Sequence, residues 1–472
     1  MPRMTQRNSL KEFLLGRSFF VLLVTLGNII FWIVPSDVLE LVAREQHVLC
    51  GRYSRQKFTW MLVVALISVV AIYIRTGANR AAIRKRVFAV LALLIGVFPV
   101  MLAADLFMRF RTDYPYKPDK VVYHRPAHAK YHLPYEDVPE ARRSYPTIRP
   151  GYGRVECVLN FDANGFRNAA VPTRCEIVAV VDSFTEGSRV SDDQPWPVLL
   201  AKQSGKCVYN LGISGYSPAE YFAATREYGL PLKPRLVLCM LYEGNDFRSA
   251  DITVKSGVKL KQIIVTSPIL MALNEMVLRV FGPIGATAIL PELDVLSWMP
   301  IGYGEGSAAR YYAFAPKQLL ELNTPKEAFA AGEAWFAAKG VLREFNDACA
   351  AGGAKLVLVY APNKAHVVFP VAASQLPAEK VRAYAALRSK KNPPPAKEFM
   401  DQLLVNLEGR EAVIREWAES KSIPFISLTK PMRDAVRAGR QPYFTYDQHW
   451  SPEGHVAAAD AVAAALRSMG LQ

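Results

Sequence analysis

The sequence predicts an α/β domain built on a parallel sheet, preceded by a membrane anchor of three helices. Three apolar runs fall within residues 1–112, and from about residue 171 short β-branched runs alternate with helical patterns. The chain has 472 residues, which exceeds the usual size of one domain. At least two structural units are therefore expected.

The apolar runs of the anchor cover residues 19–34, 58–74 and 87–104, and Lys or Arg flanks each of them. A spanning helix needs roughly 17 to 25 apolar residues, so transmembrane helices are predicted at about 19–35, 58–74 and 87–106. A secretory signal peptide is the alternative for the first run. It is disfavoured because Pro-Ser-Asp at 35–37 is no cleavage site and two more apolar runs follow.

Charge predicts the orientation of the anchor. Lys and Arg concentrate before the first run and between the second and third, whereas the other loop also carries acids. The positive-inside rule then predicts a multi-pass protein of a bacterial cytoplasmic (inner) membrane, with the large domain on the periplasmic or extracellular side. The net charge is +15, of which residues 1–112 contribute +10. The large domain has no basic cluster with interleaved aromatics, so no nucleic-acid partner is predicted.

Residues 113–170 are rich in Tyr, Pro and charge, which is typical of a linker and lead-in segment. His124, His128 and His132 recur every four residues, as metal ligands on one helix face do. Pro126 and Pro134 argue against such a helix. The sequence therefore predicts no metal site, and it predicts no cofactor.

The six cysteines contain no C-x-x-C pair. Cys157 and Cys175 are a candidate disulfide in an oxidising compartment, but spacing alone leaves the connectivity open.

The large domain, residues 171–472, is predicted to contain parallel strands at 177–181, 208–211, 236–241, 356–360 and 424–428. Helices between most of them predict a sheet covered on both faces, with ligands bound at the carboxyl ends of the strands. A long insertion, about 249–350, separates the third and fourth strands. Within it, Ser267-Pro268 starts a helical pattern whose apolar face suits a packed helix, with a lid or a membrane-docked surface as alternatives.

Reactive groups follow the predicted strands. Ser183 comes directly after the first strand, while Asp447 and His449 lie just before the final helix, which Ser451-Pro452 begins. A serine hydroxyl is a weak nucleophile until a base takes its proton, and the base needs a third group to orient it. These needs predict Ser183 as nucleophile, His449 as base and Asp447 as the orienting carboxylate.

An acyl-transfer site also needs donors for the oxyanion of its tetrahedral intermediate. The backbone N–H groups of Ser183 and Gly215 and the side-chain amide of Asn245 are predicted to supply them. Three neighbouring side chains are predicted to bind substrate: Asp182, Lys364 and Trp450.

These motifs together resemble the SGNH hydrolases, also called GDSL-type. Residues 181–187 (VDSFTEG) resemble block I, 210–216 block II and 243–246 block III, and Asp447 with His449 resembles block V. The resemblance covers roughly residues 155–470 and implies a three-layer α/β/α domain. The Asp-x-His-Trp form, with Ala-Pro-Asn-Lys at 361–364, is similar to the alginate O-acetyltransferase-like branch, which acts on exported polysaccharide.

Two positions depart from the family pattern. Val181 stands where block I usually begins with Gly, and block V is Asp-x-His rather than Asp-x-x-His. The Gly-x-Ser-x-Gly elbow of α/β-hydrolases is absent around Ser183, which disfavours that fold.

The resemblance implies a membrane-anchored serine O-acyl esterase or O-acetyltransferase that acts on cell-envelope or exported carbohydrate through an acyl-serine intermediate. Its expected partners are an acylated carbohydrate, the membrane and, for a transferase, a separate membrane protein that donates the acyl group. The alternatives are a lipid or small-ester hydrolase and a catalytically inactive glycan-binding or assembly module.

Overall fold

The computed structural model describes residues 16–33, 49–111, 117–118, 122–149, 151–247, 268–285, 299–305, 309–386, 389 and 392–471. The chain divides into two compact units. The first combines Met1–Thr112 with Glu140–Ile148 and Lys261–Leu296, and the second combines Asp113–Pro139, Arg149–Leu260 and Ser297–Gln472. The predicted insertion at about 249–350 therefore contributes residues to both units.

A five-stranded parallel sheet forms the centre of the second unit, as predicted. Its order is β13-β12-β9-β7-β8, and every neighbouring pair is parallel. The strands are β7 (Ile177–Val180), β8 (Val208–Asn210), β9 (Leu236–Tyr242), β12 (Lys355–Ala361) and β13 (Phe425–Ser427). All of β7 and β9 is buried, because helices cover both faces of a parallel sheet. This burial explains why both strands are continuous apolar runs in the sequence.

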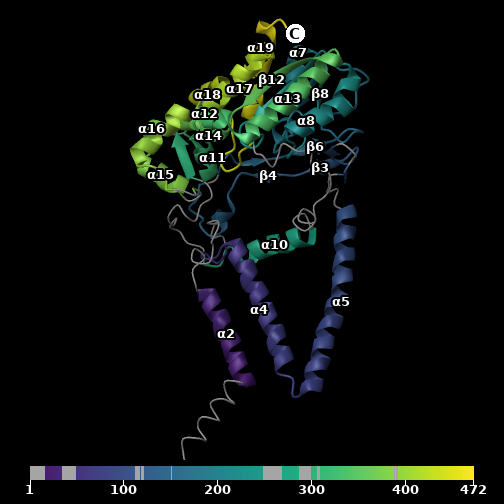
Figure 1. Cartoon of the computed structure of the whole chain (residues 1–472), viewed down its shortest axis with the longest axis vertical. Helices are drawn as coiled ribbons and strands as arrows, with labels where there is room; N and C mark the ends of the chain where they lie inside the picture. The colour runs from purple at the N-terminus through teal and green to yellow at the C-terminus, as the bar shows by residue number, and fades with distance from the viewer. Residues whose placement is uncertain are drawn as a thin grey trace, which may run out of the picture. The chain divides into compact units, whose positions relative to one another are not determined.

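Helices of the second unit surround this sheet (Figure 1). They include two groups, and the helices within each group contact one another. One group contains α7 (Trp196–Ser204), α14 (Lys364–Ala372), α18 (Thr429–Arg437) and α19 (Pro452–Ser468). The other contains α8 (Pro218–Ala224), α12 (Lys326–Ala330), α13 (Glu333–Ala351) and α17 (Gly409–Ser420). Outside these groups are α6 (Ser183–Glu186), α11 (Pro316–Leu322), α15 (Ala378–Ala386), α16 (Ala396–Asn406) and the short turns η2 (Thr225–Gly229), η3 (Leu230–Leu232) and η7 (Ala373–Gln375). The Ser451 side chain caps α19 and Pro452 is its first residue, which confirms the predicted helix start.

Short antiparallel strands form within the expected lead-in segment. β3 (Lys130–His132) pairs with β6 (Val158–Asn160), and β4 (Tyr135–Glu136) pairs with β5 (Arg154–Val155). Two further antiparallel pairs are β1 (Lys117–Pro118) with β2 (Tyr123–His124), and β10 (Met299–Tyr303) with β11 (Arg310–Phe314). His124 and His132 thus lie on strands, in agreement with the argument against a histidine-bearing helix.

The first unit contains three apolar helices where the sequence predicts them: α2 (Arg17–Ile33), α4 (Arg55–Arg75) and α5 (Arg80–Arg111). Within the described residues, two stretches are long and apolar enough to cross a membrane, Lys57–Arg75 and Arg80–Asp105, whereas the apolar helix Ser18–Ile33 is shorter. The same unit includes η1 (Glu140–Arg143) and α10 (Pro268–Phe281), the helix predicted from Ser267-Pro268.

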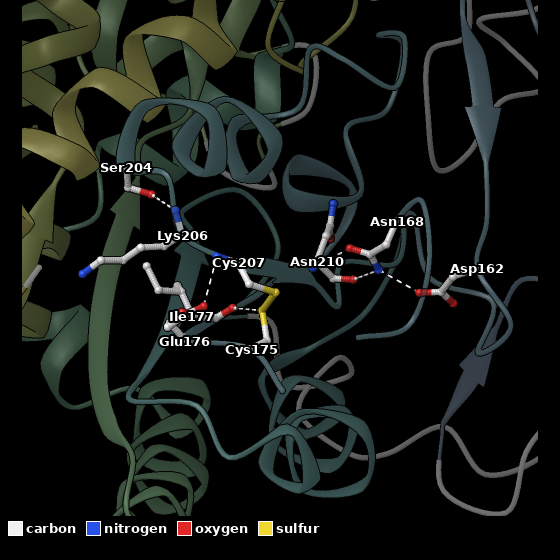
Figure 2. The surroundings of a disulfide bond; sticks show 9 residues. All are labelled: Asp162, Asn168, Cys175, Glu176, Ile177, Ser204, Lys206, Cys207 and Asn210. Atoms are coloured by element: carbon white, nitrogen blue, oxygen red, sulfur yellow. Dashed lines mark hydrogen bonds between the residues drawn. A yellow bond between two sulfur atoms is a disulfide. The ribbon is translucent and has the colours of Figure 1, made fainter. Parts of the chain in front are cut away.

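A disulfide joins Cys175 to Cys207, and not to Cys157 (Figure 2). Cys157 is buried and has a free thiol. The sequence offered Cys157 as the candidate partner, but the sheet decides the pairing, because Cys175 precedes β7 and Cys207 precedes its neighbour β8. Asn168 also links the lead-in segment to the end of β8. Its side-chain amide donates hydrogen bonds to the Asp162 carboxylate and to the backbone oxygen of Asn210.

We predict that Cys207→Ser lowers the free energy of unfolding of the second unit by about 3 to 4 kcal/mol, as expected for opening a loop of this length. Urea denaturation followed by tryptophan fluorescence measures the change. The double variant Cys175→Ser/Cys207→Ser should be no less stable than the single one. A peptide map that joins Cys157 to either residue would contradict the pairing.

Candidate active site

Ser183 lies at the carboxyl end of β7, where it opens the single turn α6. Asp182 caps this turn, because its Oδ1 accepts a hydrogen bond from the backbone N–H of Phe184 at 3.1 Å. The neighbouring Gly212 packs so closely that a Cβ there would lie 2.2 Å from the backbone nitrogen of Glu186. Any side chain at position 212 would therefore collide with the nucleophile turn.

The structure brings Ser183, His449 and Asp447 together. The Nε2 atom of His449 is 2.7 Å from Ser183 Oγ, and its Nδ1 is 2.5 Å from Asp447 Oδ1. The same carboxylate oxygen accepts the backbone N–H of His449 at 2.8 Å. The two-residue spacing is therefore compatible with a triad, because one oxygen holds both the ring and the backbone of the histidine.

Val181, the departure from block I, does not displace this geometry. Its side chain is fully buried, and its carbonyl oxygen accepts a hydrogen bond from Ile213. The valine fills the core beneath the nucleophile turn without entering the space between Ser183 and His449.

The electrostatics of the pair suit a base held by a carboxylate. Burial disfavours the imidazolium, but the adjacent Asp447 carboxylate outweighs burial and raises the pKa of His449. Burial acts against the charged form of Asp447 too, yet His449 and Arg189 together lower the pKa of this carboxyl. Arg189 Nε lies 3.4 Å from Asp447 Oδ2. The carboxylate is thus ionised and available to stabilise a protonated histidine.

The three predicted oxyanion donors line one cavity with Ser183 and His449. Gly215 adopts a φ of +86°, a conformation that glycine reaches without strain. Asn245 Nδ2 donates to Asp182 Oδ2 at 3.0 Å, which orients the amide and leaves it a second N–H. Asp182 therefore lies at the cavity wall, but its carboxylate is engaged in holding α6 and Asn245.

This cavity has a volume of about 410 Å³. One wall carries Ser183 and His449, and another comes from the lead-in segment around β3 and β6. The lead-in residues in this wall are Arg125, Tyr131, Leu133, Cys157, Leu159 and Phe161. Sequence reasoning treated 113–170 as a linker and missed this role. The aromatic residues of the segment and the Asn-Gly-Phe-Arg motif at 164–167 are the signals that point to a packed segment.

Lys364 does not lie in the cavity, so its prediction as a substrate-binding residue is wrong. Its side chain is fully buried, and Nζ donates to the backbone oxygens of Phe444, Thr445 and Asp447 at 2.9, 2.6 and 2.9 Å. The carbonyls of the loop that bears Asp447 take up all three ammonium hydrogens.

Asp137 holds the same loop by accepting hydrogen bonds from the loop's backbone N–H groups. Its carboxylate accepts from the backbone of Thr445 at 2.6 Å and of Tyr446 at 3.0 Å. Burial lowers the pKa of Lys364 to about 7, while the charges of Asp137 and Asp447 act in the opposite direction. We call this arrangement of Asp137, Lys364 and residues 444–447 the loop clamp.

Trp450, which was predicted to bind substrate, and a second histidine near the triad, His455, both lie inside the protein. Trp450 is fully buried, and its ring centroid is 5.0 Å from that of Phe184, so it supports the nucleophile turn and does not reach the cavity. His455 is buried on α19, where its Nδ1 accepts from the backbone of Trp196 at 3.3 Å. Burial, together with the charge of Arg167, lowers the pKa of His455 to about 3. The triad base is thus distinct from this neutral core histidine.

Among the described residues, two clusters contain side chains of the kinds that bind metal ions: Cys175, Glu176 and Cys207, and His366, Glu408 and Glu411. In both clusters, side chains already bond to other protein groups. Cys175 and Cys207 form the disulfide. His366 uses Nδ1 to contact Glu243 at 3.0 Å and Nε2 to contact Glu408 at 3.4 Å. Burial opposes the charge of His366, but Glu243 raises its pKa to about 9, so the histidine is a buried cation. Its contact with Glu243 anchors the segment that continues to Asn245.

The hydrogen-bonded Ser183, His449 and Asp447 are the groups of a serine hydrolase or acyltransferase that acts on ester bonds. Residues 324–472 match the family model of the SGNH hydrolase-like domain, acetyltransferase AlgX. This match confirms the predicted branch. It includes Lys364, Asp447 and His449 and does not include Ser183.

Two solved structures illustrate the wider likeness. A catalytic mutant of an acetylxylan esterase from Geobacillus stearothermophilus aligns with 14% identity and a TM-score of 0.28, over 63% of this chain and 95% of that chain. A GDSL-like lipase from Bacteroides thetaiotaomicron aligns with 14% identity and a TM-score of 0.27, over 62% and 88%. Scores this low do not by themselves establish a shared fold. No curated protein sequence matches the chain significantly.

The loop clamp predicts that Lys364→Met destabilises the second unit by about 3 to 5 kcal/mol, because buried carbonyls and the Asp137 charge lose their partner. Asp137→Asn keeps the shape and should cost less, yet both variants should slow labelling of Ser183 by a fluorophosphonate. Urea denaturation and labelling rates measure the two effects. Lys430→Met, at an exposed ion pair, is the control. Unchanged labelling in a folded Asp137→Asn protein would contradict the clamp.

The raised pKa of His449 predicts the pH dependence of catalysis. The base must be neutral to accept the serine proton, so kcat/KM should rise with pH through a midpoint above the ordinary histidine value of about 6.5. Asp447→Asn removes the carboxylate, so the midpoint should move to lower pH while the rate falls. His132→Gln, at an exposed histidine, should leave the midpoint in place. An unchanged midpoint in Asp447→Asn would contradict the assignment.

Proposed function

We propose that this protein is a membrane-anchored O-acyl esterase or O-acetyltransferase that acts on cell-envelope or exported carbohydrate. The observation that carries the proposal is the hydrogen-bonded series Ser183, His449 and Asp447 at the wall of a cavity. In this proposal Ser183 is the nucleophile, His449 the general base and then the general acid, and Asp447 the group that orients and stabilises the imidazolium.

The reaction proceeds in two acyl transfers. His449 Nε2 takes the proton of Ser183 Oγ as this oxygen attacks the acyl carbonyl carbon and forms a tetrahedral oxyanion. Collapse expels the alcohol oxygen of the donor, which leaves with the proton from His449, and an acyl-Ser183 ester remains. Water then attacks this ester in an esterase, and a sugar hydroxyl attacks it in a transferase. His449 removes the proton of either acceptor and returns it to Ser183 Oγ as the second tetrahedral intermediate collapses and the acyl–serine bond breaks.

The oxyanion is held by neutral donors in this mechanism. We assign this role to the backbone N–H groups of Ser183 and Gly215 and to the second N–H of Asn245, because the three residues line the cavity. Neutral donors of this kind are worth most where charge develops in a site that excludes water. The bond from Asn245 to Asp182 fixes the amide before substrate arrives, so little reorganisation is needed.

Polar lining favours a carbohydrate substrate over a lipid one. Beside the triad, the cavity wall carries the side chains of Arg125, Glu186, Ser188, Arg189, Ser214 and Gln448. Sugars offer many hydroxyl groups for such side chains, whereas an acyl chain offers none. The cavity volume lies in the range of about 300 to 1,000 Å³ usual for small-molecule sites.

The proposed location is the bacterial cytoplasmic membrane, with the catalytic unit on the periplasmic or extracellular side. The apolar helices and the distribution of basic residues support the anchor. The disulfide Cys175–Cys207 supports an oxidising compartment for the catalytic unit. A transferase in this position needs an acyl donor, and we propose that a separate membrane protein supplies it.

The proposal predicts that the full-length protein in detergent releases acetate from an O-acetylated polysaccharide, or transfers acetyl to the unacetylated polymer, and that Ser183→Ala abolishes both. Acetate and polymer mass are measured by mass spectrometry. Asn245→Ala should reduce turnover by about 100-fold or more. Ser420→Ala, at an exposed serine of α17, is the matched control.

Other outcomes separate the rival functions. Turnover of a phospholipid or a small aryl ester, without turnover of any acetylated glycan, would replace the carbohydrate assignment with a lipid or small-ester hydrolase. A folded protein that fails to react with a fluorophosphonate at Ser183 would contradict the acyl-serine mechanism itself.

A further inference from the structure

The helix α10 contacts the start of α4 and the residues that precede it, within the first unit. The ring of Phe281, its last residue, lies 5.0 Å from the ring of Phe58 in the first turn of α4. The Phe281 carbonyl accepts the backbone N–H of Cys50 at 2.8 Å. Arg143 of η1 pairs with Glu275 on α10 at 3.0 Å. These contacts fix α10 crosswise near the start of α4 (Figure 1).

Large apolar side chains form an exposed strip along α10 and the turn that follows it. At about 100° of rotation per residue, positions 273, 276 and 280 fall within one sector of the helix, and Ile284 follows in the turn after its end. Their exposed fractions are 49% for Leu273, 55% for Met276, 53% for Val280 and 53% for Ile284. We call this set the α10 strip.

The opposite side of α10 makes the contacts with the rest of the unit. Leu278, only 2% exposed, lies in the sector turned away from the α10 strip. Glu275 pairs with Arg143 beside this packed side and with Arg279 at 3.0 Å, whereas Arg279 lies between the two sides and its side chain is 75% exposed. The helix therefore has one face that packs and a second apolar face that no described residue buries.

The level of α10 along the apolar helices carries aromatic and basic residues. Trp32 lies in the last turn of α2 and Tyr53 precedes α4, and the centroids of their rings and of the Phe58 ring are 6.3 to 6.4 Å apart. Trp60, two residues after Phe58, is 55% exposed. Arg52, Arg55 and Lys57 lie in the same few residues. Trp, Tyr and basic residues concentrate where a membrane helix passes from hydrocarbon into the headgroups.

We propose that α10 lies in the plane of the membrane–water interface, on the periplasmic or extracellular face of the cytoplasmic membrane. There it inserts the α10 strip among the lipid acyl chains. The inference rests on the proposed membrane anchoring of α4 and α5. A helix held at the headgroup level with an apolar outer face has the bilayer as its nearest apolar phase. One side of α10 thus contacts lipid, and the other side contacts α4 and η1. The α10 strip is therefore a second attachment of the chain to its membrane.

Fluorescence quenching by lipid tests this directly. The full-length protein carries Cys50→Ser, because Cys50 is the partly exposed free cysteine among the described residues, and one new cysteine labelled with an environment-sensitive dye. Positions 276 and 280 probe the α10 strip. Position 95, exposed in the middle of α5, is the lipid control, and position 405, exposed on α16, is the water control. Each protein is reconstituted into phosphatidylcholine nanodiscs with or without brominated acyl chains.

Dyes at 276 and 280 should lose fluorescence in brominated lipid to an extent comparable with the dye at 95, while the dye at 405 should not respond. If 95 is quenched and both 276 and 280 are not, the α10 strip is covered by protein and the inference is overturned, although the anchor stands. If 95 is also unquenched, the membrane anchoring in the proposed function fails together with the inference.

Discussion

The loop clamp is the constraint on which the rest of the site depends. Residues 444–447 carry the triad aspartate, and a loop alone would leave that carboxylate free to turn. Lys364 engages the carbonyls of this segment and Asp137 engages its N–H groups, so two buried charges of opposite sign hold one short stretch of backbone. Backbone groups buried without partners are costly, and here each charge supplies what the loop lacks.

The clamp also explains why segments distant in sequence must fold together. Asp137 comes from the lead-in segment, Lys364 begins α14 after β12, and the loop itself precedes α19. An isolated bridge between Tyr443 and Trp450 closes the loop locally, and the Phe444 N–H donates to the His449 carbonyl at 3.1 Å. Local pairing shapes the loop, whereas the two charges set its position against the sheet.

A similar arrangement supports the nucleophile. Arg167, also from the lead-in segment, is buried and donates to the backbone oxygens of Glu186, Gly187 and Val190, just beyond Ser183. Its charge is met by Asp192 at 3.0 Å. The lead-in segment therefore supports the backbone beside Ser183 through Arg167 and the loop that bears Asp447 through Asp137. The same segment also forms a wall of the cavity.

The sequence by itself determined the parallel sheet, because buried strands such as β9 must be continuous apolar runs. It also predicted Ser183, Asp447 and His449, which the structure joins by hydrogen bonds, because their order along the chain resembles a known pattern. Only the tertiary structure decided what surrounds them. The sequence predicted that Lys364 binds substrate, yet in the structure its ammonium group donates to carbonyls about 80 residues away. Cys175 pairs with Cys207 because neighbouring strands bring their starts together, a register that spacing does not encode. Asp137 carries no motif, and it acquires its role only when long-range folding places it against the backbone that bears Asp447.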